Sequence, residues 1–237
     1  MIKAVLFDMD GTLLPMDVDG FVKLYFKGLS ARVAPLGYQP KELIDGVWRG
    51  ISAMIANDGS KLNSEVFWDV FCGIFGENAR QNEADFDNFY ATDFVVAKGA
   101  CGYNPRAAEI VTKLKNHGIK VVIATNPLFP LIAQHQRLSW AGVDANCFDL
   151  ITHYGNSHFC KPNLKYYEEV LAKLNLKGDE CLMVGNDVNE DMIAERLGMK
   201  VFLLTDCLLN PDGKDISVYP HGTFEDLEDY LLREYIL

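Results

Sequence analysis

The sequence lacks two features that would place it in a membrane or nucleic-acid-binding class of protein. It has no long apolar run, and the stretch from Ala4 to Phe7 is too short for a spanning helix or a signal-peptide core. Basic residues are too few for the positive surface of a nucleic-acid-binding module, since 22 Lys and Arg face 33 Asp and Glu, a net charge of −11. We therefore expect a soluble, cytoplasmic protein without a membrane or nucleic-acid partner.

The six cysteines also lack the spacing of a metal site or of a disulfide framework. No Cys-x-x-Cys pair is present, and no cysteine and histidine are spaced as zinc ligands. Free cysteine packs as a small apolar residue in a reducing compartment. The sequence thus predicts unpaired thiols at Cys72, Cys101, Cys147, Cys160, Cys181 and Cys207.

What the sequence does contain is an alternation of strand and helix patterns. The chain is 237 residues long with 49% hydrophobic residues, enough for a buried core and one or two domains. Predicted strands cover 2–7, 119–124, 148–152, 181–184 and 201–204, and predicted helices lie near 105–117, 131–141, 164–174 and 190–197. Such alternation predicts a Rossmann-like α/β fold, in which helices cover both faces of a parallel sheet.

A second pattern interrupts this alternation near the start of the chain. Between residues 16 and 93 apolar residues recur at three and four positions, clearest from Val66 to Phe75, and Gly76 can end that helix. We expect an inserted all-helical domain of about four helices over 16–93, with the core domain formed by 1–15 and 94–237. Most aromatic residues of the insert share the helical spacing, which predicts that they form its core: Phe21, Tyr25, Phe26, Trp48, Phe67, Trp68, Phe71 and Phe75.

The strongest chemical signal follows the first predicted strand. Asp8 and Asp10 lie two residues apart, so in extended chain both carboxylates point the same way. Gly11 lets the backbone turn sharply and leaves nearby amides free for an anion. An isolated Asp-x-Asp is commonly a solvated turn, but two adjacent carboxylates repel each other and favour a divalent cation between them.

Three further polar signals follow later strands, at the edge where a doubly wound sheet binds its ligand. Thr125-Asn126 could hold a phosphoryl oxygen, although Thr-Asn-Pro is also an ordinary turn. Lys161-Pro162 precedes a helix, where a lysine is commonly solvated. The run from Gly185 to Asp191 holds three acids, of which Glu190 is expected only to compensate the charge of a helix N-terminus.

The order of these four signals resembles the haloacid dehalogenase-like hydrolase superfamily, and in particular its magnesium-dependent phosphatases. Asp8 to Thr12 is similar to the first family motif, Thr125 to the second, Lys161 to the third, and Asp187 with Asp191 to the fourth. The helical insert is similar to the cap of the subgroup that includes phosphoglycolate phosphatase and β-phosphoglucomutase. Asn186 departs from the pattern, because an acidic residue often stands there, and its contact with the metal is therefore in doubt.

The resemblance implies a role for each residue. Asp8 would be the nucleophile, forming an aspartyl phosphate, and Asp10 the acid and base. Asp8, the backbone carbonyl of Asp10 and Asp187 would hold Mg²⁺, and Lys161 would add a second positive charge. Thr125 and Asn126 would bind phosphoryl oxygens. Asp191 would support the metal or orient Lys161.

Other functions share part of this pattern. A phosphomutase would use every core residue and transfer the phosphoryl group to a second hydroxyl instead of water. A dehalogenase needs no metal and has no use for Asp10, which argues against that function. A catalytically silent binding protein would not need Asp8, Asp10, Lys161 and Asp187, and the presence of all four argues against it. We therefore expect hydrolysis of a small phosphorylated metabolite, with the mutase as the main alternative.

Overall fold

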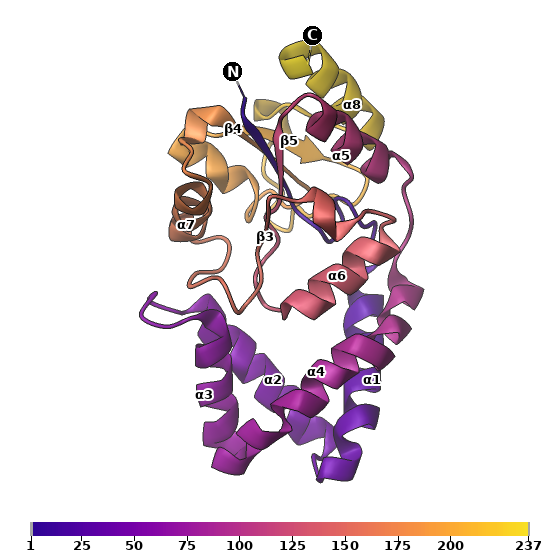
Figure 1. Cartoon of the computed structure of the whole chain (residues 1–237), viewed down its shortest axis with the longest axis vertical. Helices are drawn as coiled ribbons and strands as arrows, with labels where there is room; N and C mark the ends of the chain where they lie inside the picture. Colours follow the sequence, from indigo (N-terminus) through magenta and orange to yellow (C-terminus); the bar gives the residue numbers. More distant parts are fainter. Residues whose placement is uncertain (1, 237) are drawn as a thin grey trace.

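The computed structural model describes residues 2–236 and contains one six-stranded parallel sheet (Figure 1). The strand order is β3-β2-β1-β4-β5-β6, so the chain moves outward from β1 in one direction and then from β4 in the other. This doubly wound order places the ligand crevice beside β1, at the carboxyl ends of the strands. The strands are β1 (Ala4–Phe7), β2 (Lys120–Ile123), β3 (Leu150–Ile151), β4 (Cys181–Gly185), β5 (Lys200–Leu204) and β6 (His221–Gly222).

Helices cover both faces of the sheet because successive strand residues point to opposite sides. Val5 and Phe7 of β1 belong to one apolar cluster, together with residues of α5 (Arg106–Asn116), α6 (Leu131–Trp140) and α8 (Phe224–Leu231). Ala4 and Leu6 belong to the other, with residues of α7 (Leu164–Leu174) and η6 (Met192–Leu197). Short helical turns complete this part of the chain: η4 (Ala145–Cys147), η5 (Gly178–Glu180), η7 (Ile216–Val218) and η8 (Leu232–Ile236).

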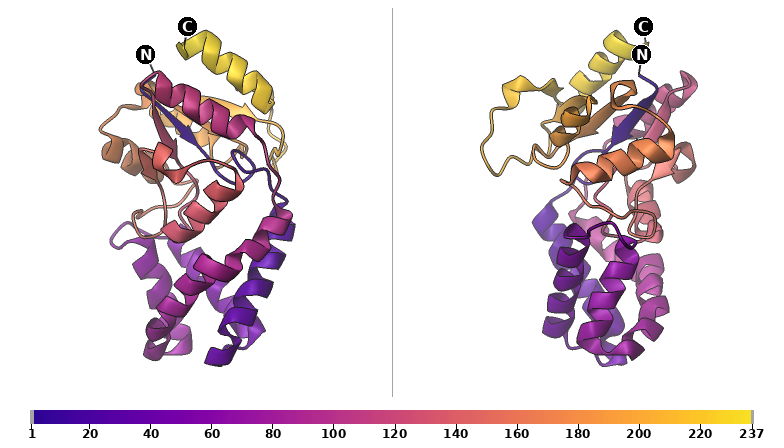
Figure 2. Two further views of the ribbon diagram at one scale, coloured as in Figure 1. Left: turned by 45° about the vertical axis from the view of Figure 1, so that its right-hand side comes forward. Right: turned by 90° about the vertical axis from the view of Figure 1, so that its left-hand side faces the viewer.

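The segment from residue 18 to residue 100, which we call the helical unit, forms the end of the molecule opposite both termini (Figure 2). The chain enters and leaves it through two adjacent segments, since Met16 bridges Cys101 and the N–H of Asp17 donates to the carbonyl of Ala100 at 3.0 Å. Its elements are α1 (Val18–Val33), η1 (Ala34–Leu36), α2 (Pro40–Ile55), α3 (Asn63–Phe75), η2 (Glu77–Asn82), α4 (Glu83–Thr92) and η3 (Asp93–Ala100).

An aromatic cluster joins the helical unit to the sheet part of the chain. The ring of Phe129, just before α6, lies 5.6 Å from that of Tyr25 and 6.2 Å from that of Phe94, measured between centroids. Phe94 in turn lies 5.0 Å from Trp140 of α6. Aromatic pairs at these distances add to the apolar burial between the two parts.

Most predicted elements are present in the structure, with three differences. The predicted helix over 190–197 was wrong in type, because only a 3₁₀ segment forms there, from Met192. β6 and α8 were not predicted. The helical part continues past residue 93 through η3, which lies along α1. All six cysteines are free, and no helix within 2–236 is long and apolar enough to cross a membrane.

Candidate active site

The four predicted loops meet at the carboxyl edge of the sheet, and the strand register explains why. Phe7, the last residue of β1, stands opposite Ile123 of β2 and Val184 of β4. The residues that follow these three positions therefore leave the sheet side by side. Asp8 is held there by its backbone N–H, which donates to the carbonyl of Val184 at 2.9 Å.

Lys161 is buried against two carboxylates. Its Nζ donates to Asp8 Oδ1 at 2.8 Å and to Asp191 Oδ1 at 2.6 Å, and the residue is only 1% exposed. Burial alone would lower the pKa of Lys161, but the charges of Asp191 and Asp8 raise it well above its usual value. Lys161 is therefore a permanent cation beside Asp8, and Asp191 orients it.

The first loop has the anion-binding shape expected from Gly11. Gly11 has a φ of +81°, and a Cβ there would stand 2.4 Å from the side-chain nitrogen of Asn186. The turn uses the N–H groups of Gly11 and Thr12 internally, whereas those of Met9 and Asp10 have no acceptor within residues 2–236. Two free amides beside Asp8 are suited to oxygen atoms of a phosphate.

Asn186 has a structural role. Its Oδ1 accepts a hydrogen bond from Thr12 Oγ1 at 3.0 Å, and its Nδ2 donates to the carbonyl of Cys207 at 2.8 Å. Both polar atoms of the side chain are therefore used to join the first loop to the loop after β5. With both atoms engaged in this way, Asn186 is not among the residues that we expect to hold a metal.

Thr125 and Asn126 leave β2 beside Asp8, but they present different groups. The carbonyl of Thr125 accepts from Thr152 Oγ1 at 2.8 Å and Tyr166 Oη at 2.9 Å, while no residue within 2–236 contacts its hydroxyl by a hydrogen bond. The Asn126 side chain donates to both oxygens of Glu190, at 3.1 and 3.2 Å. The hydroxyl of Thr125 is thus available to a ligand, and the side-chain nitrogen of Asn126 is already engaged, whereas its Oδ1 is buried without a partner within residues 2–236.

The loop after β4 carries Asp187 and Glu190. Asp187 Oδ1 accepts from the backbone N–H groups of Asn189 at 2.7 Å and Glu190 at 2.9 Å, which closes a tight turn. Burial raises the pKa of Glu190, an effect that Lys161 opposes and that Asp8 and Asp187 increase. The prediction that Glu190 only compensates a helix N-terminus was wrong, since no α-helix begins there and its carboxylate faces the site.

Arg137 is a site residue that the sequence analysis missed. Its guanidinium is fully buried on α6 and forms an ion pair with Asp10 Oδ2, and it also donates to Gln134 Oε1. Asp10 Oδ1 is buried and has no hydrogen-bond partner within residues 2–236. One signal could have revealed Arg137, because it falls on the apolar face of its helix, four residues after Ala133 and four before Ala141.

The oxygen atoms around Asp8 are of the kind that Mg²⁺ binds. Four carboxyl groups, of Asp8, Asp187, Glu190 and Asp191, surround the single ammonium of Lys161, and burial together with the charge of Asp8 raises the pKa of Glu190 and, to about 7, that of Asp191. A cation bound among these groups would relieve their repulsion. No three His, Cys, Asp or Glu side chains between residues 2 and 236 form a metal site by themselves. The predicted set needs only two, Asp8 and Asp187, with the Asp10 carbonyl, and leaves the other positions to water, which Mg²⁺ retains readily.

Comparisons with known proteins agree with this geometry. A family model of haloacid dehalogenase-like hydrolases matches residues 2–197. A glyceraldehyde 3-phosphate phosphatase of Methanothermobacter thermautotrophicus is 27% identical, over 92% of this chain and 95% of the relative.

Solved structures share the fold. A 2-haloacid dehalogenase of Pseudomonas syringae aligns with a TM-score of 0.62 and 20% identity, over 98% of this chain and 99% of the other. A hydrolase of the same superfamily from Bacillus subtilis, solved with bound magnesium, aligns with a TM-score of 0.53 and 18% identity, over 97% and 98%. Both structures support the fold assignment alone.

Proposed function

The chain belongs to the haloacid dehalogenase-like hydrolases, and we propose that it is a magnesium-dependent phosphatase that acts through phosphorylated Asp8. The observation that carries this proposal is the pairing of Asp8 with Lys161. One carboxylate oxygen of Asp8 is held by Lys161 at 2.8 Å, and the other accepts no hydrogen bond from residues 2–236. A fixed carboxylate with one free oxygen, beside free amides, is arranged to attack a bound phosphoryl group.

In the first half-reaction Asp8 Oδ2 attacks phosphorus and the bond to the leaving oxygen breaks. Asp10 gives its proton to that oxygen, so the alcohol leaves neutral. In the second half-reaction Asp10 takes a proton from water, which attacks the phosphorylated Asp8 and releases inorganic phosphate. One carboxyl group therefore serves both steps, and each step restores the protonation state that the next one needs.

The charges around Asp8 make the first step feasible. A carboxylate and a phosphate dianion repel each other, and Lys161, 2.8 Å from Asp8, offsets part of that repulsion. The amides of Met9 and Asp10 and the Thr125 hydroxyl would hold the phosphoryl oxygens, and one such donor commonly contributes about 3 kcal/mol to catalysis. Mg²⁺, held by Asp8, Asp187 and the carbonyl of Asp10, would supply the remaining positive charge.

The helical unit would serve as a cap over this site and determine which leaving groups are accepted. It meets the sheet part at the carboxyl edge, close to the four loops, and its two connecting segments lie side by side at Met16 and Cys101. Such an arrangement allows the unit to move about one narrow connection and to exclude water during the reaction. The relative from Methanothermobacter thermautotrophicus is named for glyceraldehyde 3-phosphate, and a small phosphomonoester is the substrate class that we propose here.

The test measures phosphate release from a panel of phosphomonoesters with and without Mg²⁺, using the wild type and Asp8→Asn. We expect the substitution to lower kcat by roughly 10⁴-fold or more while the fold is retained. Asp45→Asn on the exposed side of α2 is the matched control, and we expect its activity to equal that of the wild type. A folded Asp8→Asn variant with wild-type activity would end the nucleophile assignment. Formation of an isomeric phosphate ester instead of inorganic phosphate would identify a mutase.

A further inference from the structure

Glu190 is a charged side chain of the site to which the proposed mechanism gives no role. Its backbone is fixed on both sides, because its N–H donates to Asp187 Oδ1 at 2.9 Å and its carbonyl accepts from Tyr167 Oη at 2.8 Å. Its carboxylate extends to the loop after β2 and accepts from Asn126 Nδ2 with both oxygens, at 3.1 and 3.2 Å. Glu190 therefore joins the loop after β4 to the loop after β2.

Stability alone does not account for a carboxylate at this position. Lys161 directs its ammonium to Asp8 and Asp191, at 2.8 and 2.6 Å, and Glu190 forms no ion pair within residues 2–236. A half-buried carboxylate that is held by one neutral amide costs free energy. It also adds negative charge beside a site for a phosphate dianion, so it is not suited to contact the phosphoryl group. Asn126, its side-chain partner, is then the group through which it acts.

The turn at Thr125 and Asn126 presents two free donors beside Asp8. The carbonyl of Thr125 accepts from the hydroxyls of two fully buried residues, Thr152 at 2.8 Å and Tyr166 at 2.9 Å. In a planar trans peptide the next N–H points the opposite way. The N–H of Asn126 is therefore directed away from this buried pair, and within residues 2–236 neither it nor the Thr125 hydroxyl has a partner. Both donors are available to phosphoryl oxygens.

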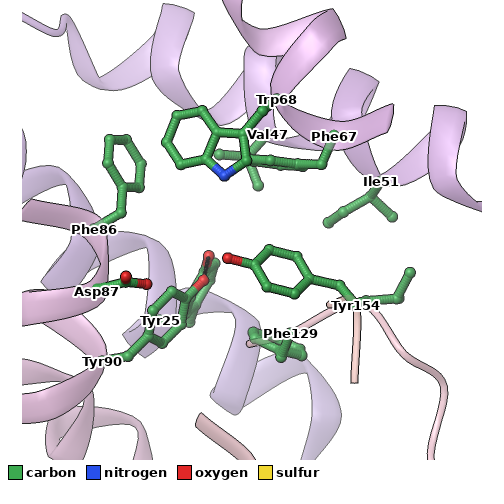
Figure 3. A pocket seen from close by; sticks show the side chains of 11 residues that line it. Tyr25, Val47, Ile51, Phe67, Trp68, Phe86, Asp87, Tyr90, Phe129 and Tyr154 are labelled. Atoms are coloured by element: carbon green, nitrogen blue, oxygen red, sulfur yellow. Dashed lines mark hydrogen bonds between the residues drawn. The ribbon is translucent and has the colours of Figure 1, made fainter. Parts of the chain in front are cut away.

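The same loop contacts the helical unit three residues later. The ring of Phe129 lies 5.6 Å from that of Tyr25, and Figure 3 shows it facing side chains of α1 to α4. A movement of the helical unit would therefore displace Phe129 and, through the short segment between them, Asn126. Glu190 belongs to the sheet part and holds Asn126 to that part.

We propose that Glu190 is a positioning residue, which holds Asn126 so that its backbone N–H and the Thr125 hydroxyl stay directed at the phosphoryl oxygens when the helical unit moves. Glu190 contacts neither the substrate nor the reacting atoms and acts through Asn126 alone. Misplacement of a group of the site by about 1 Å can lower the rate by about 10²-fold. The inference rests on the proposed function, because it concerns the phosphoryl site of that same reaction.

The test is a double-mutant cycle of Glu190→Ala and Asn126→Ala, measured as kcat/KM for 4-nitrophenyl phosphate with Mg²⁺. We expect each substitution to lower kcat/KM by about 10- to 10²-fold. The double variant should lose no more than either single variant, because both break the same contact. Glu190→Gln keeps an acceptor for Asn126 Nδ2 and should stay within about threefold of the wild type. Glu168→Ala, at an exposed acid of α7, is the matched control and should leave kcat/KM unchanged.

A second measurement is the inhibition constant of orthovanadate, whose five-coordinate form resembles phosphorus under attack. Glu190→Ala should raise this constant about tenfold or more, since the two donors are no longer in place. A loss of stability alone would leave the inhibition constant of the folded fraction unchanged, and that result would overturn the positioning role.

The kinetic outcomes separate this inference from the proposed function. Losses of the single variants that multiply in the double variant, or a Glu190→Gln variant as impaired as Glu190→Ala, would overturn the inference and leave the phosphatase intact. An unchanged kcat/KM for Asn126→Ala would do the same, whether or not Glu190→Ala folds. A wild type that releases no phosphate from any ester would overturn the proposed function and this inference with it.

Discussion

Arg137 and Asp10 form an ion pair that spans 127 residues of sequence and joins α6 to the first loop of the site. The Arg137 side chain is buried, whereas the Asp10 side chain is 30% exposed. The pair holds Asp10 by Oδ2 and leaves Oδ1 without a partner within residues 2–236. Arg137 therefore fixes the orientation of the Asp10 carboxylate.

This relationship predicts that Arg137 acts on kcat through the position of Asp10. Arg137→Met should lower kcat about 10²-fold, since small displacements of a catalytic group have effects of that size. KM should change little, because the guanidinium contacts Asp10 and not the substrate. Arg137→Lys keeps a cation on the same helix and should recover part of the loss, although it cannot reproduce the forked geometry. Steady-state kinetics of the purified variants measure all three effects.

Arg32→Met is the control for the loss of a long cationic side chain, since Arg32 makes only a partly exposed pair with Asp93 at 3.3 Å. We expect wild-type kinetics from it. Thermal unfolding separates catalysis from folding, because removing one partner of a buried pair also destabilises the protein. A folded Arg137→Met variant with unchanged kcat would contradict the positioning role.

A second prediction concerns the metal. A chelator should abolish phosphate release, and Mg²⁺ should restore it. Asp187→Asn replaces one of the two proposed carboxylate ligands while retaining the shape of the turn, and should raise the Mg²⁺ concentration for half-maximal activity by about tenfold or more. The measurement is a titration of chelated enzyme with Mg²⁺.

Glu195→Gln, which removes an exposed acid from η6 in the same region of the chain, is the matched control for this titration. Its half-maximal concentration should equal that of the wild type. Turnover that survives chelation would refute the metal requirement, and an unchanged titration for Asp187→Asn would remove Asp187 from the ligand set.

The sequence was most informative where local pattern and tertiary contacts agree. The predicted helix over 164–174 has the same bounds as α7. Its buried residues, from Tyr166 to Leu174, have helical spacing, and Asn163 caps the first turn. The succession of strands and helices along the chain, and the placement of Asp8 and Asp187 directly after strands, followed from the same pattern. In these cases the local sequence already determines which side of the element is buried.

The rest depends on contacts between distant residues. Asp191 looks like a residue of a helix start, but its Oδ1 binds Lys161 and its Oδ2 accepts from the N–H of Asp187, so a regular α-helix does not begin there. Arg137 falls on the apolar face of α6, but its pairing with Asp10 follows only once α6 is placed beside the first loop. β6 is two residues long and too short for a strand pattern. Such contacts between distant residues cannot be predicted from the periodicity of the sequence.

A third prediction concerns the contact between the start of α3 and the loop before Lys161. Asn63 is fully buried there, where its backbone N–H donates to the carbonyl of Ser157 at 2.9 Å and its Nδ2 donates to Cys160 Sγ at 3.3 Å. Asn63→Ala should lower the free energy of unfolding by about 1–2 kcal/mol, because it removes buried hydrogen bonds. It should also lower kcat/KM about tenfold, since the neighbouring Lys161 loses part of its support.

Urea unfolding and kinetics with one ester measure these effects. Asn78→Ala removes an exposed asparagine of the helical unit and is expected to change neither quantity. Loss of stability without loss of kcat/KM would show that the contact supports the fold alone and has no effect on the site.

The last prediction concerns stability in acid. Burial lowers the pKa of His153 to about 4, with smaller contributions from Lys173 and His135, and its Nδ1 accepts a hydrogen bond from the N–H of Gly155 at 3.2 Å. The unfolded chain binds this proton near pH 6.5. Between pH 6.5 and about 4 the unfolded state therefore binds more protons than the folded state, and stability falls as the pH is lowered.

His153→Gln removes this titration and keeps an acceptor for Gly155. The full linkage would be about 3 kcal/mol, and the partial exposure of the side chain reduces the expected effect to about 1–2 kcal/mol. The free energy of unfolding of the wild type should therefore fall more steeply than that of the variant from pH 7 to pH 4.5, by that amount, in denaturant titrations at each pH. His117→Gln, at an exposed histidine, should follow the wild-type curve. Parallel curves for the wild type and His153→Gln would mean that His153 takes up its proton without unfolding, and that the acid sensitivity of the fold has another source.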